Sequence, residues 1–111
     1  MVTWAGYDGA PVSLRAPIAV PVEIRAPKRR VFRLTAAVGE DGLRLAGSAP
    51  FEPGRPVDVR FDLLDGEGAL ALRAIVEEGE AGADRLAFVD PPADARELIR
   101  RYVHGRLGLP T

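Results

Sequence analysis

The sequence of 111 residues has no cysteine, one histidine, and a single lysine, Lys28, among its 15 basic residues. The lack of cysteine excludes a disulfide framework and a thiolate metal site. No apolar run approaches the roughly 20 residues that a membrane-spanning helix needs. The first residues, MVTWAGYDGAPVSLR, lack the charged start and apolar block of a secretory signal. These absences predict a soluble, cytoplasmic protein.

Catalytic side chains are equally sparse. If His104 acted as a catalytic base, it would have no evident nucleophile to activate, because Ser13 and Ser48 fall in unrelated loops. The net charge of −1 disfavours a nucleic-acid binder that works by bulk electrostatics. The acidic cluster near residue 80 lacks metal-ligand spacing and indicates a solvated loop. We therefore expect neither an enzyme nor a metalloprotein.

Hydrophobic residues recur at every second position through most of the chain, which is typical of strands buried on one face. This pattern predicts six strands, around 18–24, 32–38, 43–45, 57–63, 70–76 and 86–89. Two prolines favour an edge position for the first of these strands. In the second strand, the apolar set predicted to face the core is Phe32, Leu34, Ala36 and Val38, and the opposite face carries Arg29, Val31, Arg33 and Thr35.

The period changes after residue 90 and predicts one amphipathic helix over residues 91–107. Asp90 is the expected N-cap, followed by Pro91 and Pro92 in the first turn. Six strands and a helix predict a mainly β protein, a six-stranded antiparallel β-barrel with one C-terminal α-helix, although a β-sandwich would fit the same pattern. The expected domain covers residues 15–111, after an N-terminal segment at 1–14.

A family resemblance narrows this choice. The stretch VGEDGLRLAGSAPFEPGRP, residues 38–56, resembles the middle of a PilZ domain, the small β-barrel with which bacteria bind cyclic di-GMP. The resemblance extends roughly over residues 15–107. The family signature Asp/Asn-x-Ser-x-x-Gly falls on Ala37–Gly42, where only Gly42 is retained. The resemblance thus implies a degenerate PilZ domain that lacks most of the nucleotide-binding motif.

The second family motif, Arg-x-x-x-Arg, precedes the first strand. The string from Arg29 to Arg33 matches its letters but stands too close to Ala37. Arg15 has the expected spacing, but the position four residues earlier is Pro11. Arg15 and Gly42 are therefore the remaining candidate ligand-binding residues. Each lost charge-assisted hydrogen bond is worth about 1.5–3 kcal/mol, so we expect no cofactor and no ordinary binding of cyclic di-GMP.

Two functional hypotheses follow. The resemblance implies a non-catalytic adaptor in bacterial signalling, with a role in motility or type IV pilus regulation, that binds protein partners. Its candidate partner-binding residues are Trp4, Tyr7, Lys28, Arg29, Arg30 and Arg33. Trp4 and Tyr7 could instead pack back on the barrel, and the basic residues could guard a strand edge. The alternative hypothesis is a cyclic di-GMP receptor that uses Arg15 and the basic patch at 28–33, with candidate ligands Arg29, Arg30 and Arg33.

Overall fold

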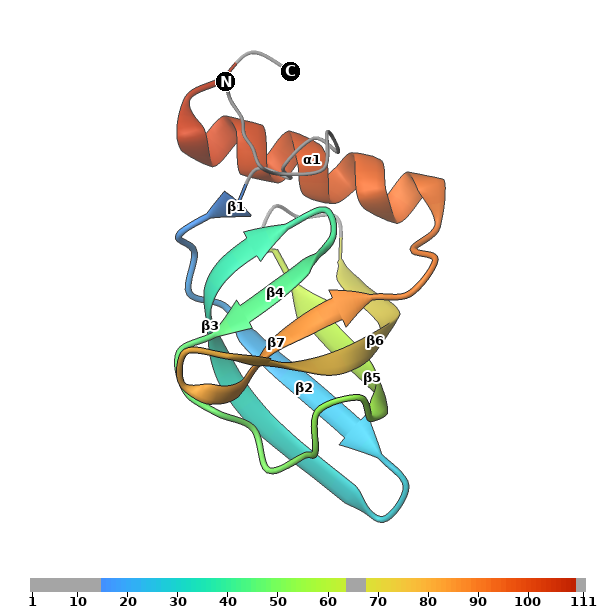
Figure 1. The fold of residues 1–111 in the computed structure, drawn as a ribbon. Helices are drawn as coiled ribbons and strands as arrows, with labels where there is room; N and C mark the ends of the chain where they lie inside the picture. The colour runs from blue at the N-terminus through green and yellow to red at the C-terminus, as the bar shows by residue number, and fades with distance from the viewer. Residues whose placement is uncertain (1–14, 64–67, 110–111) are drawn as a thin grey trace, which may run out of the picture.

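Seven strands and one C-terminal helix form the part of the chain that the computed structural model describes, residues 15–63 and 68–109 (Figure 1). Every strand pairing is antiparallel. The elements, in chain order, are β1 (Arg15–Ala16), β2 (Pro21–Ala26), β3 (Arg29–Gly39), β4 (Gly42–Leu45), β5 (Pro56–Asp62), β6 (Ala69–Gly79), β7 (Gly82–Phe88) and α1 (Ala93–Leu107).

The sheet closes on itself. Its strand order is β1-β3-β2-β5-β6-β7-β4, and an additional pairing of β3 with β4 joins the two ends. β2 to β7 thus form a closed six-stranded barrel, and the short β1 pairs with the end of β3. Closure removes most sheet edges, which are otherwise sites of unwanted pairing. The predicted six-stranded antiparallel barrel with one C-terminal helix is confirmed.

β5 follows the predicted alternation most closely. Val57, Val59 and Phe61 are buried, whereas Asp58 and Arg60 are exposed. The inward residues of neighbouring strands meet them in one hydrophobic core. Its largest fully buried side chains are Ile24, Leu43, Leu45, Leu63, Leu86, Ile99 and several valines.

β2 lies inside the sheet, between β3 and β5, so the predicted edge position is wrong. The prolines do not prevent this arrangement. Pro17 precedes the strand and Pro21 is its first residue, a position at which a missing N–H is tolerated. The predicted apolar face is correct, because Ile18, Val22 and Ile24 are all buried.

The predicted inward face of the second strand is wrong over its first half. Residues directly opposite each other in a sheet share a face, and Arg33 and Val31 lie opposite the buried Val22 and Ile24. Phe32 and the next alternate residues of β3 therefore point outward. An irregularity between Thr35 and Ala37 then changes the phase, so that Val38 is buried as predicted.

The helix begins at Ala93, two residues after the predicted start. A residue that precedes proline is pushed out of the helical region, so Pro91 cannot open a helix before Pro92. Pro92 takes the N-cap position without a side-chain hydrogen bond, and Asp90 adopts a positive φ of 44° instead of capping. At the other end, Gly108 forms a left-handed C-cap.

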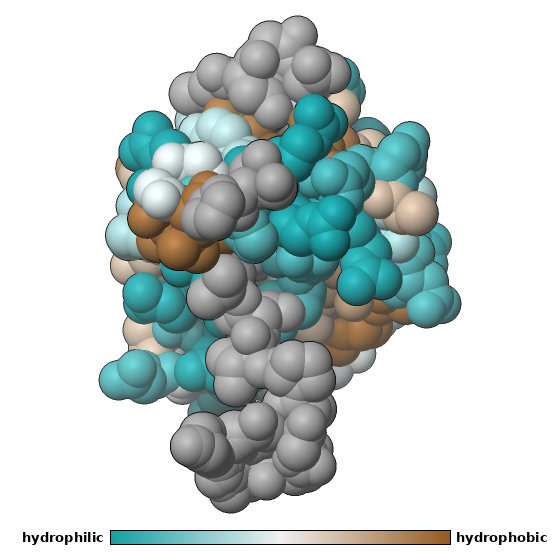
Figure 2. Space-filling view, turned by 90° about the horizontal axis from the view of Figure 1, so that it is seen from above, coloured by the Kyte–Doolittle hydropathy of each residue, from teal (hydrophilic) through white to brown (hydrophobic). Residues whose placement is uncertain are grey.

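α1 lies across one end of the barrel, where it contacts β1 and β3 (Figure 1). Ala95, Ile99 and Val103 form its buried face. Seen from this side, most of the described surface is hydrophilic and the hydrophobic areas are small and separate (Figure 2). α1 covers this end of the barrel, whereas the outward residues Ala69 and Ala71 of β6 stay accessible.

Candidate functional site

The two candidate residues retained from the family motifs lie close together at the helix end of the barrel. Arg15 of β1 pairs with Gly39 at the end of β3, and Gly39 pairs with Gly42 of β4. The structure thus brings together positions 15 and 42, which are 27 residues apart in the sequence. Ala37 lies near them in β3 but is buried and apolar.

The charges around Arg15 do not favour an anion. Its guanidinium lies 3.3 Å from both carboxylate oxygens of Asp41. Glu40 stands beside Asp41 and lies 4.0 Å from Arg96 of α1. A phosphate at Arg15 would therefore have to compete with a carboxylate that is already bound there, beside a second one. Gly42 itself is buried against β7, opposite Ala87, and offers no side chain.

The predicted basic residues lie on the hairpin of β2 and β3, at the far end of β3 from Arg15. The turn holds Lys28 with φ of 68°, as expected for a tight turn. Arg30 points to the outer face, where it lies 3.5 Å from Glu23. Arg33 belongs to the other face and donates hydrogen bonds to the carbonyl oxygens of Phe32 and Ser48.

Arg15 and the tip of this hairpin lie far apart. Arg15 pairs with Gly39, the last residue of β3, whereas Arg29 is the first. Ten steps along a strand, at about 3.3 Å each, separate these ends by about 30 Å. Arg29 and Arg15 are thus too far apart for one dinucleotide to contact both. None of the hollows that the described residues line brings Arg15 together with residues 28–33, as the receptor hypothesis requires.

Sequence reasoning missed two hydrophobic residues on the same hairpin. Phe32 is 61% exposed and Leu34 is 53% exposed, the largest exposures among the large hydrophobic residues described. They share the outer face of β3, and Pro21 of β2 lies opposite Leu34. The guanidinium of Arg30 lies 5.9 Å from the centre of the Phe32 ring. Only the register of β3 with β2 shows that these two residues face outward, and that register is known only from the fold.

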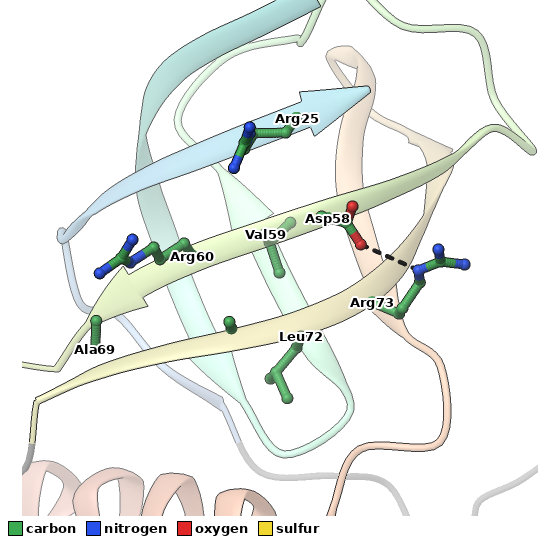
Figure 3. Close-up of a pocket in the computed structure, with 8 residues that line it drawn as sticks. Arg25, Asp58, Val59, Arg60, Ala69, Leu72 and Arg73 are labelled. Carbon is green, nitrogen blue, oxygen red and sulfur yellow. Dashed lines mark hydrogen bonds and ion pairs between the residues drawn. The ribbon is translucent and has the colours of Figure 1, made fainter. Parts of the chain in front are cut away.

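A shallow hollow of about 430 Å³ continues this outer face across β2, β5 and β6. Arg25, Arg60 and Arg73 project from these three strands around it, and Arg73 is hydrogen-bonded to Asp58 at 3.0 Å (Figure 3). Arg60 forms no ion pair with the described residues. Ala71 also lines the hollow, and its small side chain leaves the space between the arginines open.

We name the outer face of the β2–β3 hairpin together with this hollow the arginine face. Its members are Pro21, Glu23, Arg25, Arg30, Phe32, Leu34, Arg60 and Arg73. The other candidate residues, Trp4 and Tyr7, lie outside the described residues. Within residues 15–63 and 68–109, no group of three or more side chains could hold a metal ion, and no helix is long and apolar enough to cross a membrane.

Comparison with protein families identifies the barrel. The PilZ domain family matches residues 13–105. The chain belongs to the PilZ family. This match covers β1 to β7 and most of α1, so the whole described barrel is the PilZ domain.

Solved structures support the same fold. The chain is 16% identical to the Bacillus subtilis inhibitor of motility MotI/DgrA, with a TM-score of 0.69, and the match covers 86% of this chain and 49% of that one. It thus spans about half the length of that protein. The PilZ domain of CeSA from a cellulose-synthesizing bacterium is 24% identical, with a TM-score of 0.61, and the match covers 82% of this chain and 95% of that domain. No curated protein matches.

Proposed function

We propose that this PilZ domain is a non-catalytic signalling adaptor that binds a protein partner through the arginine face and does not bind cyclic di-GMP. The observation that carries this proposal is the exposure of Phe32 and Leu34 among arginine side chains. Large apolar side chains ringed by arginine are typical of the central contacts of protein interfaces. A monomeric domain gains nothing in stability from placing both of them outside its core.

The charge of the hairpin indicates what kind of partner fits. Residues 21–34 contain five basic side chains and one acid, Glu23. Glu23 is already shared between Arg25 and Arg30, and its side chain is only 16% exposed. The accessible charge is therefore positive. An acidic protein surface would be attracted to this face and oriented on it.

The opposite end of the barrel supports the exclusion of the nucleotide. Arg15 is paired with Asp41, and Ala37 and Gly39 supply neither the acid nor the hydroxyl of the family signature. Restoring a phosphate contact would require the loss of the Arg15–Asp41 pair. Loss of three charge-assisted partners, at about 1.4 kcal/mol per tenfold in affinity, would weaken a submicromolar site to the millimolar range or beyond.

The cellular role that we propose is the control of motility or type IV pili. The support is the fold shared with an inhibitor of motility and membership of the PilZ family. In this role the domain would act from the cytoplasm, by occupying a surface of its target.

Isothermal titration with cyclic di-GMP tests the ligand half of the proposal. We expect no heat of binding at micromolar concentrations. The matched variant Arg15→Ala should behave in the same way. Micromolar binding that Arg15→Ala abolishes would make the domain a second-messenger receptor and would overturn this half.

Site-specific photo-crosslinking in the native host tests the partner half. A photoreactive phenylalanine analogue at Phe32 should capture a specific protein, whereas the same analogue at Leu107, which is 37% exposed near the end of α1, should not. The double variant Phe32→Ser and Leu34→Ser should lose this partner in affinity capture, and Arg15→Ala should retain it. Undiminished capture by the double variant would show that the arginine face is not the binding surface.

A further inference from the structure

The first half of β3 has an open backbone edge. β2 pairs with Arg29–Leu34 along one edge of the strand. On the other edge, β4 pairs only from Thr35 onward, and the last contact on that side is the hydrogen bond from Ala46 N–H to the Leu34 carbonyl. Residues 29–33 therefore have a strand on one side and, within the described part of the chain, none on the other.

The direction of each backbone group follows from the ladder. Thr35 N–H donates to the carbonyl of Val20, so Thr35 faces the β2 edge. Backbone groups alternate between the two edges of a strand, and Leu34, which accepts from Ala46, faces the other. Arg30 and Phe32 lie four and two residues before Leu34 and therefore face the same edge as Leu34. Their N–H and carbonyl groups thus point to the open edge.

One of these groups is covered by a side chain. Arg33 donates from Nη1 to the carbonyl oxygen of Phe32 at 2.8 Å, and from Nε to the carbonyl of Ser48. A charged side chain that masks an edge is a known way to limit unwanted pairing. Only the carbonyl is masked, since a guanidinium cannot accept a hydrogen bond. The N–H groups of Arg30 and Phe32 remain available as donors to an incoming strand.

We propose that the partner contributes an acidic, extended segment that adds as a strand to β3 at residues 29–33. This inference rests on the proposed function and specifies how the partner is recognised. Backbone hydrogen bonds to an exposed edge would supply affinity, and alternate side chains would supply specificity. One face of the added strand would lie beside Phe32 and Leu34, and the other would lie beside Arg29 and Arg33.

Charge selects the occupant. A second copy of this chain would place the same edge, with Arg29, Arg30 and Arg33, against itself. Like charges directly opposite each other in a sheet are destabilising, so self-pairing is disfavoured. A segment with acidic residues at alternate positions would instead place carboxylates next to Arg29 and Arg33, and could draw the Arg33 guanidinium away from the Phe32 carbonyl.

A synthetic octapeptide of alternating valine and glutamate, blocked at both ends, is a suitable probe. It should bind the full chain in the micromolar range by fluorescence anisotropy, whereas the same peptide with lysine in place of glutamate should not. In amide hydrogen exchange, the acidic peptide should protect the N–H groups of Arg30 and Phe32 more than that of Arg44, a residue of the already paired strand β4.

A backbone substitution separates strand addition from side-chain contact. Arg30→Pro and Arg30→Ala both remove the guanidinium, but only proline removes the N–H at the open edge, where it is tolerated. We expect the proline variant to bind the acidic peptide at least about fivefold more weakly than the alanine variant, for one backbone hydrogen bond. If Arg30→Pro misfolds, the exchange protection of Arg30 and Phe32 in the unaltered chain still shows whether the peptide binds these backbone N–H groups.

Any of three results with the unaltered chain would overturn strand addition: no binding of the acidic peptide at millimolar concentration, equal binding of the lysine peptide, or binding without protection of Arg30 and Phe32. Equal affinities of the two folded Arg30 variants would do so as well. None of these results bears on whether the native partner is captured through Phe32 and Leu34. Failure of the proposed function would be seen separately, as undiminished capture by the Phe32→Ser and Leu34→Ser variant.

Discussion

The carbonyl oxygen of Leu86 lies 2.1 Å from the point that a Cβ atom on Gly42 would occupy. The neighbouring strand β7 therefore lies so close to β4 here that only glycine fits at this position. Gly42 falls on the last position of the family signature in the resemblance described above. Its presence is explained by packing between two strands and does not require a bound nucleotide.

Gly42→Ala should destabilise the domain by at least about 3 kcal/mol, because the atom in the way belongs to the backbone and cannot rotate aside. Urea unfolding followed by circular dichroism would measure this loss. Gly47→Ala is a matched control, since a Cβ at Gly47 has no heavy atom within 4 Å, and it should change stability by less than about 0.5 kcal/mol. Equal effects of the two variants would contradict the packing argument.

Thr35 joins β3 to the segment before β2 through its hydroxyl group. The hydroxyl accepts from Val20 N–H at 2.9 Å and donates to the carbonyl of Ile18 at 2.5 Å, and the residue is only 1% exposed. Thr35→Val should cost about 2–4 kcal/mol, because two buried backbone groups lose their partner. Thr35→Ser keeps the hydroxyl and should cost about 1 kcal/mol for one methyl group. A valine variant as stable as the serine variant would show that these bonds contribute little.

Two phenylalanines of the barrel should lose very different amounts of stability on truncation. Phe61 is 2% exposed and its ring is stacked on that of Phe88, with centroids 6.1 Å apart. Phe61→Ala should lower the free energy of unfolding by about 3–5 kcal/mol. Phe32→Ala should lower it by less than about 1 kcal/mol, since it loses only exposed contacts with Arg30. A large loss at Phe32 would indicate a structural role and would weaken the adaptor proposal.

Trp4 and Tyr7 remain candidate partner contacts. Removal of Met1–Tyr7 should weaken capture of the native partner by about tenfold if one aromatic anchor is lost. Its effect on the melting temperature should be small. A strong drop in melting temperature with unchanged capture would instead assign these aromatic residues to packing against the barrel.

Several elements were predictable because one face of each was clearly apolar. The alternation of Val57, Val59 and Phe61 placed β5 correctly, and the spacing of Ile99 and Val103 placed α1. The helix start was missed by two residues because Asp90 is a good cap in isolation. The second of two prolines excludes its predecessor from the helix, and that local restriction outweighed the capping preference.

The candidate site was predictable only in part. The family positions pointed to Arg15 and Gly42, which the fold does bring together, but the carboxylate of Asp41 at Arg15 was not expected. The basic residues Lys28 to Arg33 were recognised as a patch. Phe32 and Leu34 were assigned to the core because they alternate in step with Val38, and the sequence gives no sign of the irregularity between Thr35 and Ala37 that changes the phase.

The sequence by itself determined the main strands, their tight turns and the terminal helix, because these depend on local periodicity and on residue identity. Only the tertiary structure decided which face of β3 is outside. That choice depends on its register with β2, where Val22 and Ile24 bring Val31 and Arg33 to the inner face and leave Phe32 in solvent. Register is a long-range property, since a shift by one residue reverses every side chain of a strand.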